Sequence, residues 1–370
     1  MTQRLLLLNG LAIFAVVCNH AATWGHAALF WWIYGIVDEV SKPNYEHLGT
    51  FSYYALLLIS KFTIFAVPSF LFVTGFFIAY TARGTQSTLT WKIAQTRLKW
   101  LLIPYLIWSV VIFIFNLRFG GVSLPSEYLK QLILGQAEGT YYYIPLLCQF
   151  YFLSFVILPI AKHHWRLLLL VSGFIQVVCI TLYYLYTFNT PILGLATALP
   201  PISITFFPPT IFFFTFGVVA GVHLEHFKQI LTQIKRFLPP AVFILALASV
   251  IEGDAFYRAT NLRWHGGYQT LPAGLYGLAF VLTFLAFYDL NIPFSKLIHE
   301  FGRRSFGIYL IHATWLGIVA HTIRIFMPSI LRLQILYQPI LIVLGIGTPF
   351  LLMSLTIKSP LRSAYRYLFG

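Results

Sequence analysis

The chain has 370 residues, of which 59% are hydrophobic and only 9% are charged, whereas ordinary soluble domains carry about 25% charged residues. Apolar stretches run from end to end without a polar linker, which excludes a string of soluble domains and favours one membrane domain over residues 1–370. The formal net charge is +14, but no soluble module carries it, so we set a nucleic-acid partner aside.

A membrane-spanning helix needs about 20 mostly apolar residues, and ten windows of the sequence meet this requirement. The windows are residues 5–24, 53–80, 100–117, 142–161, 166–187, 209–226, 237–252, 271–290, 305–326 and 334–357. We therefore predict an all-α, polytopic integral membrane bundle of about ten transmembrane helices. The first window has the outline of a secretory signal, but polar residues interrupt it and no clear cleavage site follows, so we keep it as the first span.

The first span contains the residue that points most directly to function, His20. It lies about 15 positions into the window, or roughly 22 Å along a helix, which is past the middle of a bilayer core about 30 Å thick. An ionisable group at that depth is costly and marks a functional site, although an imidazole bonded between helices is the structural alternative. Asn9 precedes His20 by 11 residues. Eleven helical steps of about 100° amount to about 20° more than three full turns, so the two side chains share one face of the helix. Asn19 is placed to hold an imidazole tautomer.

Further along the chain, Tyr141, Tyr142 and Tyr143, like Trp31 and Trp32, are typical of the aromatic belt at a membrane interface. The proline-rich segment 188–208 has no charge and is predicted to be an outer loop or a re-entrant element.

Two other places in the sequence have histidines that are candidates for chemistry. His312 lies about two turns into the ninth window, on the same face as Ser305, and is either catalytic or a core histidine bonded to a neighbouring helix. His223, Glu225 and His226 have the residue types of a metal site, but no further ligand is near in sequence, so we predict no metal. Phosphate loops and the other motifs of soluble enzymes are absent, and no tightly bound cofactor is expected.

The charges indicate an orientation. If the N-terminus lies inside, most of the 24 lysines and arginines fall on the cytoplasmic side and most of the ten acidic residues fall outside, which fits the positive-inside rule. Both termini are then cytoplasmic. The basic face has two interpretations: attraction to anionic membrane lipid, or a site for a phosphate-rich ligand that approaches from the cytoplasm.

Four sequence elements resemble the acyltransferase-3 family of membrane-bound acyltransferases, over essentially the whole chain. The first is Leu8-Asn-Gly-Leu-Ala-Ile-Phe-Ala-Val-Val-Cys-Asn-His20, similar to a family helix in which a basic residue, ten residues and a histidine recur. The others are Val67-Pro-Ser-Phe-Leu-Phe-Val-Thr-Gly-Phe-Phe-Ile78, Arg97-Leu-Lys-Trp-Leu-Leu-Ile-Pro-Tyr105 and Ser305-Phe-Gly-Ile-Tyr-Leu-Ile-His312, the last similar to the family's S-Y-G-I-Y-L-I-H.

One position departs from the family pattern, because Asn9 stands where a basic residue is usual. Another cation, such as Arg4, Arg97 or Arg304, then takes over the charge, or the donor is held differently.

The resemblance implies an enzyme that transfers an acyl group, acetyl or another short acyl, from acyl-coenzyme A at the cytoplasmic face to a hydroxyl of a carbohydrate or lipid-linked acceptor. Together with the residue pattern it nominates His20, Asn9 and His312 for catalysis, with His20 as the base. Donor phosphates are expected on a set of cations: Arg97, Lys99, Arg303, Arg304 and Arg4. We expect a multi-pass protein of a bacterial plasma membrane.

Two other function classes fit the composition. A transporter or flippase for a glycolipid or hydrophobic metabolite would line its path with intramembrane His and Asn, and repeat symmetry between halves, which we do not see, would favour it. A structural or assembly subunit fits the aromatic content but leaves His20 unexplained.

Overall fold

The computed structural model describes residues 2–32, 43–82, 91–117, 124–188, 202–260 and 267–370. These residues form helices and no strand, which confirms the all-α prediction. The longer helices are α1 (Thr2–His26), α2 (Phe51–Phe62), α3 (Ala66–Thr81), α4 (Trp91–Leu117), α5 (Pro125–Leu134), α6 (Tyr143–His163), α7 (Trp165–Thr187), α9 (Ile211–Val222), α10 (Leu224–Ile234), α11 (Leu238–Ala259), α12 (Leu271–Ala286), α13 (Ser295–Arg303), α14 (Ser305–Phe326) and α15 (Gln334–Lys358).

Short helical turns extend or join these helices. They are η1 (Ala27–Trp31), η2 (Tyr45–His47), η3 (Pro208–Thr210), η4 (Lys235–Phe237), η5 (Pro328–Arg332), η6 (Pro360–Ala364) and α16 (Tyr365–Phe369). The predicted element at 188–208 falls mostly on residues 189–201, which lie outside the described residues.

Eight helical stretches within the described residues are long and apolar enough to cross a membrane, so the chain is a multi-pass integral membrane protein. They are Thr2–Trp31, Phe51–Thr81, Trp91–Leu117, Tyr143–His163, Trp165–Thr187, Leu224–Ala259, Ser305–Phe326 and Gln334–Lys358. The two remaining windows correspond to α9 and α12, whose 12 and 16 residues are fewer than the roughly 20 that a span needs. Ten crossings and cytoplasmic termini stay predictions.

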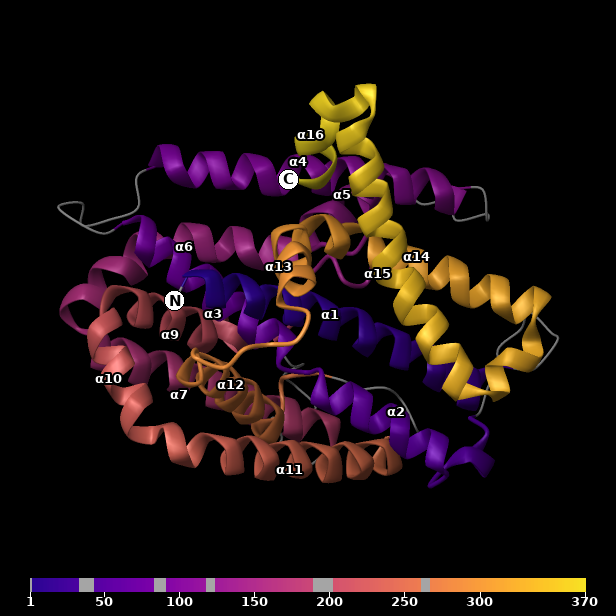
Figure 1. Ribbon diagram of the computed structural model, residues 1–370, viewed down its shortest axis with the longest axis horizontal. Helices are drawn as coiled ribbons and strands as arrows, with labels where there is room; N and C mark the ends of the chain where they lie inside the picture. Colours follow the sequence, from indigo (N-terminus) through magenta and orange to yellow (C-terminus); the bar gives the residue numbers. More distant parts are fainter. Residues whose placement is uncertain (1, 33–42, 83–90, 118–123, 189–201, 261–266) are drawn as a thin grey trace.

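Helix α1 lies at the centre of the bundle, with α2, α3, α13, α14 and α15 packed around it (Figure 1). Among the described residues, the most extensive contact between two helices joins α3 to α9. Gly75 of α3 faces the backbone at Phe214, and Gly217 of α9 faces the backbone at Phe72, so a Cβ at either glycine would collide with the other helix. Small residues of this kind let two apolar helices approach closely enough to pack by van der Waals contact.

The second predicted span is not one continuous helix, because it is interrupted between α2 and α3 at residues 63–65. Pro68 lies in the first turn of α3, where it has no N–H to donate back toward the preceding turn. The carbonyls exposed at the end of α2 are bonded from other helices: Asn19 Nδ2 donates to Ser60 O at 2.9 Å, and Tyr276 OH donates to Phe62 O at 2.8 Å. Hydrogen bonds of this kind satisfy the carbonyls that lose their intrahelical partner, and they allow a helix break inside a membrane bundle.

Three hydrogen bonds identify the opposite ends of the bundle. The backbone N–H of Leu271, at the start of α12, donates to the hydroxyl of Tyr184 near the end of α7 at 3.0 Å. At the other end, Arg4 donates to the carbonyls of Phe284 and Phe287 at 3.2 and 2.7 Å. The start of α1 therefore lies at the same end of the bundle as the end of α12. The end of α7 lies at the opposite end, about 24 Å away along the 16-residue helix α12.

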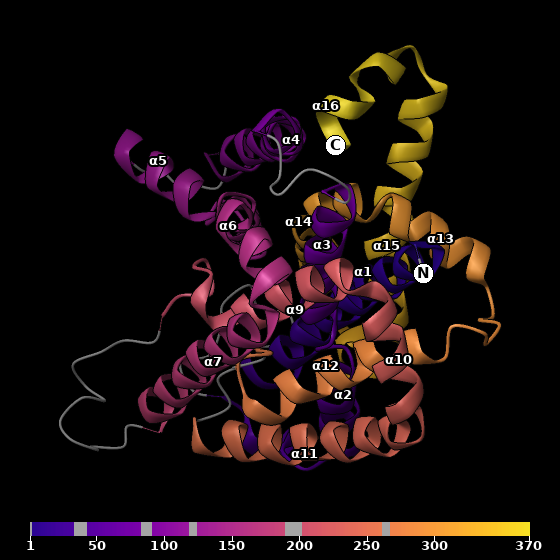
Figure 2. The same ribbon diagram turned by 90° about the vertical axis from the view of Figure 1, so that its left-hand side faces the viewer.

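The C-terminal helix α16 folds back from the end of α15 and lies beside α4, as both views show (Figure 2).

The expectation of an interfacial aromatic belt is wrong for at least two of its residues. Tyr141 is fully buried and its hydroxyl donates to Leu310 O at 2.6 Å, while Trp32 is 5% exposed. A hydrogen-bond partner in the interior can satisfy a tyrosine as well as interfacial water does, and the sequence does not distinguish the two.

Candidate active site

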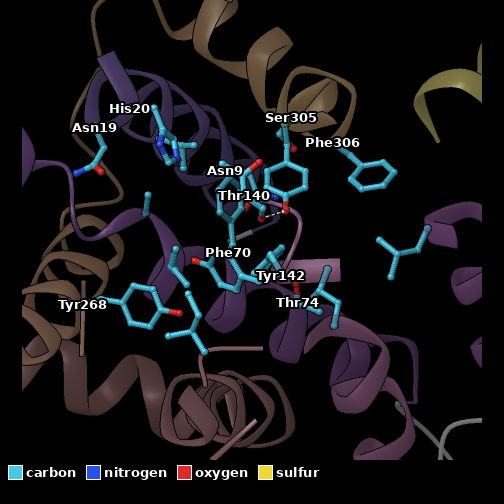
Figure 3. Close-up of a pocket in the computed structure, with 18 of the residues that line it drawn as sticks. Asn9, Asn19, His20, Phe70, Thr74, Thr140, Tyr142, Tyr268, Ser305 and Phe306 are labelled. Atoms are coloured by element: carbon cyan, nitrogen blue, oxygen red, sulfur yellow. Dashed lines mark hydrogen bonds between the residues drawn. The ribbon is translucent and has the colours of Figure 1, made fainter. Parts of the chain in front are cut away.

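A cavity of about 930 Å³ lies among α1, the break between α2 and α3, α4, α6 and α14 (Figure 3). At one end of the bundle it is lined by Arg97 near the start of α4 and Ser305 at the start of α14. Toward the other end it is lined by Tyr183 near the end of α7 and by Tyr268 just before α12. The cavity thus reaches from one end of the bundle toward the other, and its wall is mainly apolar with a few polar groups, as is usual for small-molecule sites.

His20 lines this cavity from α1 and is only partly covered by protein. Asn19 and Thr23 of the same helix and Thr63 at the helix break also line the wall here. The side-chain amide of Asn19 is hydrogen-bonded to the helix break, since its Nδ2 donates to Ser60 O and to Thr63 Oγ1 at 2.9 and 3.1 Å. The break therefore lies directly beside the imidazole that the sequence nominated as the base.

His312 does not line the cavity but lies behind His20, fully buried, with ring centroids 5.4 Å apart. Its Nδ1 lies 2.8 Å from the carbonyl of Tyr309 and 3.2 Å from that of Ile308. Because a carbonyl can only accept, Nδ1 carries the hydrogen, and in the neutral ring Nε2 is left as an acceptor. Nε2 is buried and has no hydrogen-bond partner among the described residues. An orphaned acceptor next to a cavity histidine is an arrangement that can orient or receive a proton.

Asn9 lines the cavity on the same helix as His20, and its Oδ1 is buried without a hydrogen-bond partner in the described part of the chain. Arg97 lines the same cavity, and it also shares with Asn9 and Thr74 a smaller adjoining cavity of about 110 Å³. Of the cations that the sequence offered in place of a basic residue at position 9, Arg97 is therefore the one that the fold brings to Asn9.

The other predicted donor-binding cations face different surroundings, and none of them lines the cavity as far as the chain is described. Arg4 is committed to the end of α12, where its guanidinium also lies 4.3 Å from the ring centre of Phe284. Arg303 and Arg304 pair with Glu300 at 3.0 and 3.7 Å. The ammonium of Lys99 lies 5.3 Å from a ring centre of Trp100. These four side chains are therefore absent from the described wall of the cavity that His20 borders.

Tyrosines that the sequence does not mark as site residues form much of the wall. Tyr142, Tyr143, Tyr268 and Tyr309 line the cavity, and Tyr309 donates its hydroxyl proton to the carbonyl of Thr140. A tyrosine hydroxyl is protonated at neutral pH, and burial raises the pKa of Tyr268 further, so the hydroxyls of Tyr142 and Tyr268 can donate to a ligand. Tyr309 belongs to the motif Ser305-Phe-Gly-Ile-Tyr-Leu-Ile-His312, whereas only their position in the fold distinguishes Tyr142, Tyr143 and Tyr268 from the other tyrosines of the chain.

His223 and Glu225, which have the residue types of a metal site, contact other groups of the protein. His223 Nε2 lies 2.9 Å from the carbonyl of Ala161, and Glu225 pairs with Lys228 at 2.8 Å. These side chains lie on α10 and at its start, away from the residues that line the cavity.

Comparison with known proteins identifies a family and several relatives of this chain. A family model described as an acyltransferase domain matches residues 4–354 of this chain. Proteins from Staphylococcus aureus strains MRSA252, MSSA476 and MW2, each named "Probable poly-beta-1,6-N-acetyl-D-glucosamine export protein", are 26% identical to it over 263 residues, which is 69% of this chain and 69% of each relative. No solved structure matches the chain.

Proposed function

The chain belongs to the acyltransferase-3 family and is thus an acyltransferase, and from that premise we propose that it transfers a short acyl group from acyl-coenzyme A to a carbohydrate hydroxyl. The observation that carries the proposal is the position of His20, an imidazole inside the bundle that borders a cavity of about 930 Å³. The donor enters at the end of the bundle that holds Arg97, and the acceptor enters at the end that holds Tyr268.

The proposed reaction is a single acyl transfer with His20 as general base. The imidazole takes the proton of the acceptor hydroxyl as its oxygen attacks the thioester carbonyl, so a C–O bond forms and the C–S bond breaks. The imidazolium then returns the proton to the leaving thiolate of coenzyme A. Acid–base catalysis of this kind contributes about 10²- to 10⁴-fold in rate. His312, held by the Tyr309 carbonyl, keeps the neighbouring ring oriented and adds an acceptor at Nε2.

The name of the relatives supports a carbohydrate acceptor, and β-1,6-linked N-acetylglucosamine oligosaccharides are the first class to test. The tyrosine-rich wall is suited to such a ligand, because an aromatic face packs against the C–H face of a sugar while phenolic hydroxyls bond its polar edge. A lipid-linked sugar would satisfy the same wall. The membrane is proposed to be a bacterial plasma membrane, with the donor end of the bundle in the cytoplasm.

The proposal is tested with protein purified in detergent or nanodiscs, labelled acetyl-coenzyme A and N-acetylglucosamine oligosaccharides. Wild-type protein should acetylate the oligosaccharide, and His20→Ala should lose at least 10²-fold in kcat while it stays folded. His226→Ala changes an exposed histidine outside the cavity and serves as the matched control. A fully active His20→Ala variant would remove His20 as the base.

Export is the second candidate function, because the relatives carry that word in their name and the cavity extends toward both ends of the bundle. The two functions give different results in sealed vesicles. Movement of unmodified oligosaccharide across the membrane without any acyl product supports transport, and an acylated product supports the transferase.

A further inference from the structure

The C-terminal segment adds a cation to the donor end of the cavity. Among the described residues that line the cavity, the two with a permanent positive charge are Arg97 of α4 and Arg366 of α16. The family model ends at residue 354, so Arg366 lies beyond the part of the chain that it describes. No carboxylate among the described residues lies within ion-pair distance of Arg97 or Arg366, and both side chains are exposed at the cavity mouth.

Arg366 is held by stacking on Trp100. The guanidinium carbon lies 3.8 Å from a ring centre of Trp100, which itself lines the cavity. Trp100 follows Arg97 by three residues on α4, so the two side chains are neighbours on one face of that helix. A stacked guanidinium keeps its N–H edge free, and that edge matches two oxygens of a phosphate group.

The segment that carries Arg366 is docked on α4 rather than loosely attached to it. Trp108 donates its indole N–H to the carbonyl of Leu368 at 2.8 Å, and the side chain of Phe369 is 3% exposed. The rings of Trp100 and Tyr367 lie 5.4 Å apart. These contacts preorganise the arginine, so less side-chain entropy is lost when it binds a ligand.

A second positive feature lies at the same mouth. Ser305 begins the 22-residue helix α14 and lines the cavity, so the positive end of that helix dipole is close to the site. Helix N-termini bind phosphate through this field and their unpaired N–H groups.

We propose that Arg366, stacked on Trp100, binds a phosphate group of the acyl donor together with Arg97 at the donor end of the cavity. This inference rests on the proposed function for the identity of the donor. The C-terminal segment is then part of the substrate site and not only a cover for α4. The ligand chemistry is that of a nucleotide-linked thioester with several phosphate oxygens.

The test compares donor kinetics in Arg366→Gln, Arg366→Lys and the control Arg362→Gln, which changes an exposed cation of the same segment outside the cavity. Arg366→Gln should raise the donor KM about ten-fold with little change in kcat or acceptor KM, Arg366→Lys should raise it less, and Arg362→Gln should not change it. With acetyl-pantetheine, a thioester donor that has no nucleotide phosphates, wild type and Arg366→Gln should have equal KM values. An unchanged KM for acetyl-coenzyme A, or an equal increase with acetyl-pantetheine, would overturn the proposal.

Direct titration of free coenzyme A by calorimetry separates this inference from the proposed function. Coenzyme A should bind wild type about ten-fold more tightly than Arg366→Gln even if no acyl transfer is detected, an outcome that would count against the transferase reaction only. Equal affinities in the two proteins, or no binding to wild type, would refute the role of Arg366 whatever the activity. Melting temperatures of all variants identify any that fail to fold, and Arg366→Lys then provides the comparison.

Discussion

The imidazole of His312 lies against that of His20, with 5.4 Å between ring centroids and a tilt of 51° between ring planes. His20 borders the cavity, whereas His312 has no exposed surface and bonds through Nδ1 to the carbonyl of Tyr309 at 2.8 Å. His20 is therefore the histidine that faces the cavity, and His312 is the histidine whose tautomer is determined by a backbone carbonyl.

Replacement of His312 should affect turnover more than donor binding. We expect His312→Gln to lower kcat about 10- to 100-fold with an almost unchanged donor KM, because the ring that orients His20 is lost while the cavity mouth stays intact. Steady-state kinetics with each substrate varied in turn measure kcat and the two KM values separately. A loss confined to KM, or full activity in a folded variant, would contradict the positioning role.

Asn9 is expected to show opposite effects on activity and stability. Its Oδ1 is buried without a hydrogen-bond partner among the described residues, so Asn9→Ala should cost little stability and can raise the melting temperature. The same variant should lower activity less than His20→Ala does, since a neutral amide orients a ligand but transfers no proton. Thermal unfolding and transfer rates are measured side by side. Asn9→Arg, which restores the family's usual charge, should keep activity, and its complete inactivity would show that the position does not meet the donor.

The predicted donor-binding cations should differ in their effect on the donor KM according to whether they line the cavity. Arg97→Gln should raise the donor KM several-fold, because Arg97 lines the cavity beside Asn9. The double variant Arg303→Gln, Arg304→Gln should raise it less, since both side chains pair with Glu300 outside the cavity. Donor titration at fixed acceptor gives both values. If the double variant has the larger effect, the donor approaches along α13 and the present site must be revised.

The helix break should be sensitive to the side chains that bond its carbonyls. Asn19→Ala and Tyr276→Phe each remove a donor to the end of α2, at Ser60 and Phe62, and each should cost about 1 kcal/mol of stability. Tyr288→Phe, which changes an exposed tyrosine, is the matched control and should leave the melting temperature unchanged. Loss of activity is expected for Asn19→Ala alone, because Asn19 lines the cavity next to His20. Equal melting temperatures in all three variants would mean that water satisfies the break.

Reporter fusions decide whether α9 and α12 cross the membrane. With ten spans, fusions after residues 90, 164, 232 and 299 should report cytoplasm, and fusions after residues 44, 128, 196, 260 and 330 should report the outside. The informative pairs are 196 with 232, which flank α9, and 260 with 299, which flank α12. Reporters on the same side within a pair would show that the short helix enters and leaves the membrane on one side.

The sequence alone was sufficient for properties that depend on composition and on neighbours along one helix. Charge depletion and window length predicted an all-α membrane bundle, since an apolar chain in lipid must bond its backbone internally. The spacing of Asn9 and His20 placed both on one face of α1, and both line the cavity. These inferences need only the helical period and the length of a span.

The tertiary structure decided which distant residues meet. His312 joins His20, Arg97 joins Asn9, and Arg366 stacks on Trp100, although no local pattern links the members of any pair. Arg303 and Arg304, equally basic, are turned toward Glu300 instead. The physical reason is that helix packing sets the angle at which each side chain points into the bundle, and that angle depends on close contacts such as the one between Gly75 and Phe214, which become visible only when both helices are in place.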